Sequence, residues 1–226
     1  TDHVVEVGAG LGSLTLALAD TGADVTAIEV DAGMVPVLRN EVANRENVRV
    51  VEADAMRLDW DEMLDPTIKW VLVANLPYNV GTPLVCDLLD FVPQVERILV
   101  MVQREVAERF AAAPSTSAYG AISVKAAYWG SARIVGIVPS TVFVPRPNVE
   151  SALVEITRRT PPATDPVELF TLVKTAFGQR RKMLRKSLSG VVAADQFEAA
   201  GVAGTSRPEE LDVGAWCRLT EIVHGN

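Results

Sequence analysis

Short runs of β-branched residues alternate with segments of helical periodicity over the first half of the chain, and this alternation limits the fold more than any other feature. Strands that alternate with helices predict a parallel sheet with helices on both faces. Thr82 and Pro83 predict the start of the fourth helix, with Thr as the cap. The expected strands are residues 4–7, 25–30, 48–52, 70–74 and 97–102, and the expected helices are 11–21, 33–45, 83–91 and 104–112.

In the second half of the chain, the alternation of strands and helices ends. Residues 132–138 and 149–157 predict two more strands joined by a proline-rich loop, a hairpin-like end to the sheet. The stretch "RRTPPATDP", residues 158–166, has the composition of a linker. We therefore expect a Rossmann-like α/β domain over 1–158 and a small all-helical domain over 166–226. The helices expected after the linker are 167–177, 181–192, 195–200 and 213–223.

Composition indicates an ordinary globular protein of 226 residues with 49% hydrophobic residues and a net charge of −8. No apolar stretch approaches the roughly 20 residues of a membrane helix, and the first residues lack a basic region followed by an apolar core, so we expect no secretory signal. Cys86 and Cys217 match no metal or redox spacing, so we expect two core thiols, no metal and a reducing cytoplasm. We also expect a monomer. The acidic average does not exclude nucleic acid as a partner, because binding requires a local basic patch.

A glycine loop follows the first strand, in the sequence Glu6-Val7-Gly8-Ala9-Gly10-Leu11-Gly12. Glycines at this place allow a tight turn and a close approach to a ligand. A dinucleotide fingerprint would place its last glycine at position 13, where this chain has Ser13. The pattern acid-x-Gly-x-Gly-x-Gly instead resembles class I methyltransferases that use S-adenosylmethionine, with Glu6, Gly8 and Gly10 as cofactor-binding residues. The alternative is a structural turn without a ligand.

Two acids lie at the ends of the next two strands. Glu29 ends the second strand, where a carboxylate can accept hydrogen bonds from both ribose hydroxyls of an adenosine. Asp54 follows the third strand and is expected to accept from an adenine amine, while the amide of Ala55 donates to the ring. Either acid alone could be a solvated strand end. Together with the glycine loop they predict a cofactor site at the carboxyl edge of one sheet.

The fourth strand ends in Asn75-Leu76-Pro77-Tyr78, at the same edge of the sheet. This stretch predicts either a capped turn or a pocket for a flat, hydrogen-bonding ring. Asn-(Leu/Ile)-Pro-Tyr resembles the motif of methyltransferases that act on exocyclic amines of nucleic-acid bases. The longer "NLPYNVGTPL" resembles the KsgA/RsmA family of rRNA adenine dimethyltransferases. Three further stretches resemble that family: "VFVPRPNVESALV" at 142–154, "FGQRRKMLRKSL" at 177–188 and "SRPEEL" at 206–211.

The resemblance implies a substrate and roles for the motif. The substrate would be two adjacent adenosines in a hairpin loop near the 3′ end of 16S rRNA in the small ribosomal subunit. Asn75 and the carbonyl of Leu76 would accept the two N–H bonds of the adenine amine, and Asn75 would also lie beside the cofactor. Pro77 would fix the backbone, and Tyr78 would stack on the base. Phe143 would form the second stacking wall, unless it is an ordinary core aromatic.

A basic stretch lies on one expected helix of the second domain. Five cations within seven residues form a local contrast to the negative chain, and they suit rRNA phosphates. A solvated helix face is the alternative. The five residues are Arg180, Arg181, Lys182, Arg185 and Lys186; Arg104, Arg109, Arg146, Arg158 and Arg159 are candidates to extend the patch.

The family resembled here carries a segment before the first strand, with a Gln-Asn-Phe-Leu motif that covers the cofactor. If the molecule begins at Thr1, we expect weakened cofactor binding. The leading hypothesis is a 16S rRNA adenine dimethyltransferase. An Erm-type 23S rRNA methyltransferase, a non-catalytic ribosome assembly factor and, more distantly, a dinucleotide oxidoreductase are the alternatives.

Overall fold

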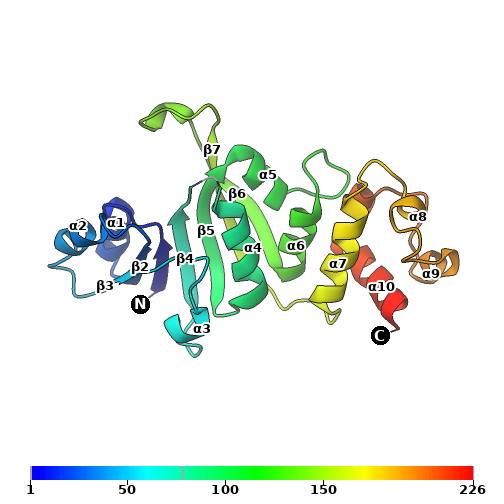
Figure 1. Ribbon diagram of the computed structural model, residues 1–226, viewed down its shortest axis with the longest axis horizontal. Coiled ribbons are helices and arrows are strands. Elements are labelled where there is room, and N and C mark those ends of the chain that lie inside the picture. Colours follow the sequence, from blue (N-terminus) through cyan, green and yellow to red (C-terminus); the bar gives the residue numbers. More distant parts are fainter. Residues whose placement is uncertain (1, 78, 226) are drawn as a thin grey trace. The chain divides into compact units, whose positions relative to one another are not determined.

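The computed structural model describes residues 2–77 and 79–225. The chain folds into two compact units (Figure 1). The first unit comprises Thr1–Ala107 and Arg133–Arg158, and the second comprises Glu108–Ala132 and Arg159–Asn226. None of the helices formed by the described residues is long and apolar enough to cross a bilayer.

A seven-stranded sheet in the order β3-β2-β1-β4-β5-β7-β6 organises the first unit. The five strands from β3 to β5 are parallel, and β7 runs antiparallel to β5. This confirms the predicted parallel sheet and its hairpin-like end. The strands are β1 His3–Val7, β2 Asp24–Glu29, β3 Val48–Glu52, β4 Trp70–Asn75, β5 Val95–Gln103, β6 Gly130–Val138 and β7 Ser151–Arg158.

The strand order reverses its direction of progress at β1, which lies between β2 and β4. Crevices at such a switch point, outside the carboxyl ends of parallel strands, are where open α/β sheets bind ligands. The register is set by apolar side chains: Val5 and Leu72 face each other across β1 and β4, and both are fully buried. The ladder therefore brings the last residues of β1, β2 and β4 to one edge of the sheet.

Five helices follow the first strands, and one of them begins earlier than expected. The helix α4 begins at Gly81 rather than at Pro83, because the N–H groups of Val80 and Gly81 both donate to the carbonyl of Pro77. A side chain at Gly81 would meet Val102 Cγ1 at 2.9 Å, so this start requires glycine. The short α3 was not predicted. The helices are α1 Ser13–Asp20, α2 Val35–Glu41, α3 Trp60–Met63, α4 Gly81–Phe91 and α5 Arg104–Phe110.

The second unit contains more of the chain than the predicted helical domain 166–226. Residues 108–132 join it, because Tyr119 and Tyr128 are buried in the same apolar core as Trp216. The Tyr119 hydroxyl donates to the carbonyl of Leu211, and the Tyr128 hydroxyl donates to that of Thr164. The helices are α6 Ala121–Trp129, α7 Pro166–Phe177, α8 Leu184–Ser187, α9 Ala194–Ala199 and α10 Val213–His224, together with the 3₁₀ turn η2 Pro208–Glu210. The other 3₁₀ turn, η1 Ser140–Val142, belongs to the first unit.

The helix predicted over 181–192 is wrong in extent, since helix α8 covers Leu184–Ser187 alone. The N–H groups of Leu184 and Arg185 donate to the carbonyls of Ser206 and Gly204. They are therefore not available for helical bonds to residues 180 and 181. A tertiary connection between two distant loops has replaced the expected helix with turns.

Candidate active site

A pocket of about 400 Å³ lies at the carboxyl ends of β1, β2 and β4; we call it the edge pocket. Five predicted cofactor-binding residues line it: Gly8, Glu29, Asp54, Ala55 and Asn75. Leu76 and Pro77 line it as well. The remaining lining residues are Val7, Ile28, Val30, Asp31, Met34, Ala53, Met56 and Val80. Glu6 and Gly10 lie outside this lining.

Glu29 is held by the backbone around it. Its Oε2 accepts from the N–H of Gly10 at 2.7 Å, and its Oε1 accepts from those of Val30 and Asp31, each at 2.9 Å. A carboxylate can accept about four hydrogen bonds, so the group keeps capacity for a hydroxyl of a ligand. With 6% exposure, Glu29 is an acceptor held in a fixed position in the wall of the edge pocket.

The glycine loop takes a shape that side chains would oppose. Gly10 has φ +57, and the N–H that it presents in this conformation is the one that binds Glu29. Gly12 has φ +91, and a Cβ there would lie 2.9 Å from Leu38 Cδ1. Both positions lie in the left-handed region that favours glycine. A Cβ at Gly10 would meet no atom within 4 Å, so the space before the loop is open to a ligand.

Glu6 is buried beneath the glycine loop, with 1% exposure. Its Oε2 accepts from Thr15 Oγ1 at 2.5 Å, which connects β1 to the first turn of α1. Burial raises the pKa of Glu6, the Thr15 hydrogen bond opposes this, and the charge of Glu29 raises it further. The observed contact is therefore structural, and a direct role of Glu6 in cofactor binding stays a prediction.

Asp54 lines the edge pocket from the turn after β3. Its Oδ1 accepts from the N–H of Met56 at 3.0 Å, and its Oδ2 lies 3.6 Å from Arg57 Nε. These local contacts orient the carboxylate, whose side chain is 42% exposed. The polar groups that line the edge pocket are thus the carboxylates of Glu29, Asp31 and Asp54 together with backbone groups, around an apolar cavity. This lining fits an adenosine with a positively charged sulfonium.

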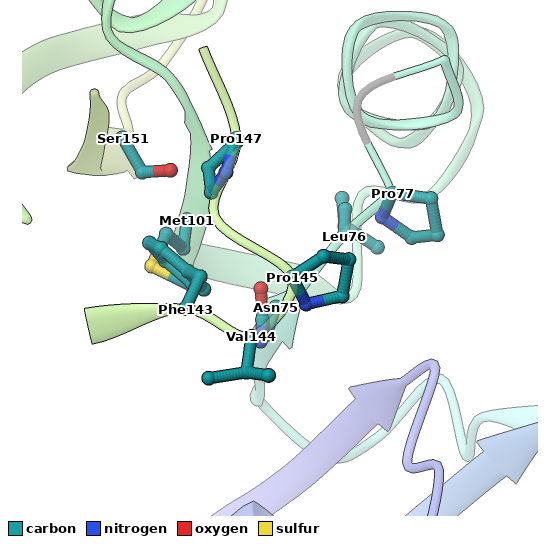
Figure 2. Close-up of a pocket in the computed structure, with 9 residues that line it drawn as sticks. All are labelled: Asn75, Leu76, Pro77, Met101, Phe143, Val144, Pro145, Pro147 and Ser151. Atoms are coloured by element: carbon teal, nitrogen blue, oxygen red, sulfur yellow. The ribbon is translucent and has the colours of Figure 1, made fainter. Parts of the chain in front are cut away.

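A second pocket of about 290 Å³ lies next to the first; we call it the loop pocket. Asn75, Leu76 and Pro77 line both pockets, so one stretch of backbone is their common wall. Met101 of β5, Ser151 of β7 and the loop before β7 complete the loop pocket (Figure 2). The loop contributes Phe143, Val144, Pro145 and Pro147. Phe143 was predicted for this position, whereas the prediction for Tyr78 lies outside the described residues.

Four of the five predicted RNA-binding cations gather around a hollow of about 440 Å³, which we call the basic hollow. They are Arg181, Lys182, Arg185 and Lys186, and they make no ion pair within the described residues. Met183, Thr205, Arg207 and Glu210 complete the lining. Sequence reasoning noted the stretch 206–211 that contains Arg207 but did not connect it with the cations.

Arg180 differs from its neighbours. Its Nη2 donates to the carbonyl of Ser117 at 2.8 Å, and its Nε lies 3.5 Å from Glu209 Oε2. It therefore connects the loop before α6 to η2, and its predicted role in RNA binding stays a prediction.

Three other candidate arginines have internal partners. Arg158 donates to the carbonyls of Leu88, Leu89, Val92 and Val95 around the end of α4, so its guanidinium caps that helix. Arg104 pairs with Glu150 at 2.8 Å, and Arg146 Nε donates to Ser140 Oγ at 3.0 Å. The described residues hold no cluster of three potential metal ligands.

The strand order of the sheet, the glycine loop after β1, and the edge pocket with the adjacent loop pocket define a Rossmann-like methyltransferase fold. The chain belongs to the family described as ribosomal RNA adenine dimethylase, whose model matches residues 1–224. It is 45% identical to ribosomal RNA small subunit methyltransferase A of Cutibacterium acnes over 98% of this chain and 79% of that protein. Its identity to the protein of the same name from Thermobifida fusca is 47%, over 97% of this chain and 80% of that protein.

Two solved structures resemble the fold over nearly the whole chain. A dimethyladenosine transferase from Plasmodium falciparum has a TM-score of 0.82 and 24% identity, over 97% of this chain and 88% of that one. The 23S rRNA methyltransferase ErmE has a TM-score of 0.74 and 24% identity, over 99% of this chain and 91% of that one. At this identity the likeness shows the fold, which the two kinds of enzyme share.

Proposed function

We propose that this protein transfers methyl groups from S-adenosylmethionine to the exocyclic amines of two adjacent adenosines in the 3′-terminal hairpin loop of 16S rRNA. The single observation that carries the proposal is the wall shared by the two pockets. Asn75, Leu76 and Pro77 face the edge pocket on one side and the loop pocket on the other. A donor and an acceptor bound in these pockets would meet at this wall.

The edge pocket suits the cofactor, which supplies an activated methyl group on a sulfonium when it is bound. Glu29 offers a fixed carboxylate at the end of β2 for a ribose hydroxyl, and Asp54 offers one at the end of β3 for the adenine amine. Gly8 and Gly10 allow the backbone to come close to the ligand. The three acids in the wall, Glu29, Asp31 and Asp54, also favour a cationic ligand over a dinucleotide that carries a 2′-phosphate.

The loop pocket suits the target adenine. Phe143, Pro145 and Pro147 provide flat apolar surfaces for the faces of a base, and a base that stacks on an aromatic side chain gains about 1–3 kcal/mol. Asn75 and the carbonyl of Leu76 accept the two N–H bonds of the amine and turn its lone pair toward the edge pocket. Such alignment contributes roughly 7–11 kcal/mol to catalysis without a strong base.

An adenine can enter the loop pocket only when it has left its stack. RNA hairpin loops present splayed bases, which lowers this cost. The basic hollow supplies cations for the phosphates of the surrounding rRNA, in a chain whose net charge is −8. We infer that the protein acts as a monomer on the small subunit in the cytoplasm.

The test uses unmethylated small subunits, labelled S-adenosylmethionine and the protein with and without Asn75→Ala. Dimethyladenosine should appear at two adjacent positions of 16S rRNA. The variant should lose about 100-fold or more in kcat, as for removal of one preorganised hydrogen-bonding group from an active site. A parallel reaction with 23S rRNA distinguishes the Erm-type alternative. Label in 23S rRNA alone, or full activity of Asn75→Ala, would reject the proposal.

A non-catalytic assembly factor is the other candidate. It predicts that the protein binds small subunits while no label enters RNA. The intact wall at Asn75 to Pro77 argues for catalysis, because binding alone needs no pocket on each side of these residues.

A further inference from the structure

The loop between β6 and β7 exposes apolar side chains beside the loop pocket. Val144 is 99% exposed and Val142 is 63% exposed, while Phe143 between them lines the pocket. Single exposed valines are ordinary on protein surfaces. Two on either side of a pocket-lining aromatic, one of them at the lip of the pocket itself, form an apolar rim. Val144 occupies this position in Figure 2, in the chain between Phe143 and Pro145.

Hydrogen bonds, an ion pair and prolines restrain this loop. Arg146 Nε donates to Ser140 Oγ across it, and the N–H of Val142 donates to the carbonyl of Pro139. At the far end of the loop, the N–H of Arg104 donates to the carbonyl of Glu150, and the two side chains form an ion pair at 2.8 Å. Prolines at 139, 145 and 147 restrict the backbone further. The rim is therefore preorganised, and its use by a ligand costs little conformational entropy.

Charge indicates what the rim contacts. Arg146 is the one ionisable residue between positions 139 and 149, in a chain with a net charge of −8. A nucleotide offers an apolar base face together with a negative phosphate, and both match valine side chains beside a guanidinium. The rim is also continuous with the pocket proposed for the target adenine, since Phe143 and Val144 both line that pocket, so it is within reach of a nucleotide next to the target.

We propose that Val142 and Val144 hold the base adjacent to the target adenine, keeping the RNA loop splayed while the target lies in the loop pocket. This inference rests on the proposed function. It makes Val144 a positioning residue, which lines the loop pocket and contacts the neighbouring base there. Apolar side chains that support an opened base step are a general device of nucleic-acid-binding proteins.

Three substitutions of Val144 test the inference. Val144→Ile keeps an apolar surface, Val144→Thr keeps the shape but adds a hydroxyl, and Val144→Asp adds a charge that repels phosphate. Because this side chain is almost fully exposed, none of them removes packing from the core. The matched control is Val167→Asp, which adds the same charge at a residue with 73% exposure in α7.

The measurements are kcat/KM on unmethylated small subunits, the Kd for S-adenosylmethionine and the Tm. We expect Val144→Ile to match the unaltered protein and Val144→Asp to lose about fivefold to tenfold in kcat/KM, with Val144→Thr between them. Cofactor affinity and Tm should not change. Val144→Asp within about twofold of the unaltered protein, or an equal loss in Val167→Asp, would overturn the inference. If the unaltered protein itself transfers no methyl to RNA, the proposed function fails and the inference with it.

Discussion

The edge pocket and the basic hollow differ in what holds their polar side chains. At the edge pocket, Glu29 and Asn75 end strands whose register is fixed by backbone ladders, and Glu29 accepts three backbone N–H groups. In the basic hollow, Arg181 and Lys182 precede the short helix α8, and Arg185 and Lys186 lie on it. Hydrogen bonds from Leu184 to Ser206 and from Arg185 to Gly204 join this stretch to a second loop. The first arrangement fixes individual atoms, whereas the second collects charge.

This difference matches two kinds of recognition. Alignment of a methyl group with an amine depends on atomic positions, so a rigid strand end suits it. Attraction of phosphates depends mainly on the number of cations and is screened by salt. We therefore expect substitutions at the edge pocket to cause large, salt-independent losses, and substitutions in the basic hollow to cause smaller, salt-dependent ones.

The largest effect on cofactor binding should come from Glu29→Gln. The amide NH₂ of Gln cannot accept the hydrogen bonds that one carboxylate oxygen now accepts, and bonds to a charged group are worth about 1.5–3 kcal/mol each. The Kd for S-adenosylmethionine should rise at least about tenfold in a calorimetric titration. Glu52→Gln, at the register partner of Glu29 on β3, is the control and should leave the Kd unchanged. An unchanged Kd in Glu29→Gln would show that the fixed carboxylate of Glu29 does not contribute to cofactor binding.

A smaller effect, on the salt dependence of RNA binding, should be seen on substitution of Arg181 and not on substitution of Arg180. Arg181→Ala removes a cation of the basic hollow that forms no ion pair with any other described residue, so the slope of log K against log salt for RNA binding should fall by about one. Arg180→Ala should leave that slope unchanged and lower the Tm by a few degrees, since Arg180 connects Ser117 to Glu209. Filter binding at several salt concentrations and thermal unfolding provide the two measurements. Equal changes of slope would place Arg180 among the RNA contacts.

Glu6→Gln should have the smallest effect, and it depends on pH. Burial raises the folded-state pKa of Glu6 above 4.5, so the folded state favours the protonated form, and stability falls as the pH rises from 4.5 through the folded-state pKa. Gln stays neutral and can still accept from Thr15. The variant should therefore have a Tm higher by a few degrees at about pH 7, and the advantage should vanish below pH 4.5. A lower Tm for the variant at neutral pH would show that the charge of Glu6 stabilises the fold.

Local sequence predicted the sheet and much of the edge pocket because their determinants are local. The β-branched runs specified β1 to β5, and parallel strands necessarily bring their carboxyl ends to one edge. Predicted residues at three strand ends, Gly8, Glu29 and Asp54, therefore line one pocket. Phe143 joins Asn75 in the loop pocket although it is 68 residues further along the chain, and the motif resemblance, not periodicity, placed it there.

Predictions that depended on contacts between distant residues were less accurate than those that rested on local sequence. The segment 108–132 was expected in the first domain, but the burial of Tyr119 and Tyr128 beside Trp216 places it in the second unit. The helix expected over 181–192 is limited to α8, because the N–H groups of Leu184 and Arg185 donate to a loop more than 15 residues away. Arg207 completed the basic hollow through the same connection.

The sequence by itself determined the parallel sheet, the glycine loop and the placement of Asn75 at a strand end, because strand periodicity and glycine conformations are properties of a few neighbouring residues. The tertiary structure decided which cations gather around the basic hollow, which unit residues 108–132 join, and that one stretch of backbone forms the wall of two pockets. These outcomes depend on which distant groups satisfy each buried hydrogen-bonding atom and each apolar surface, and no local pattern contains that information.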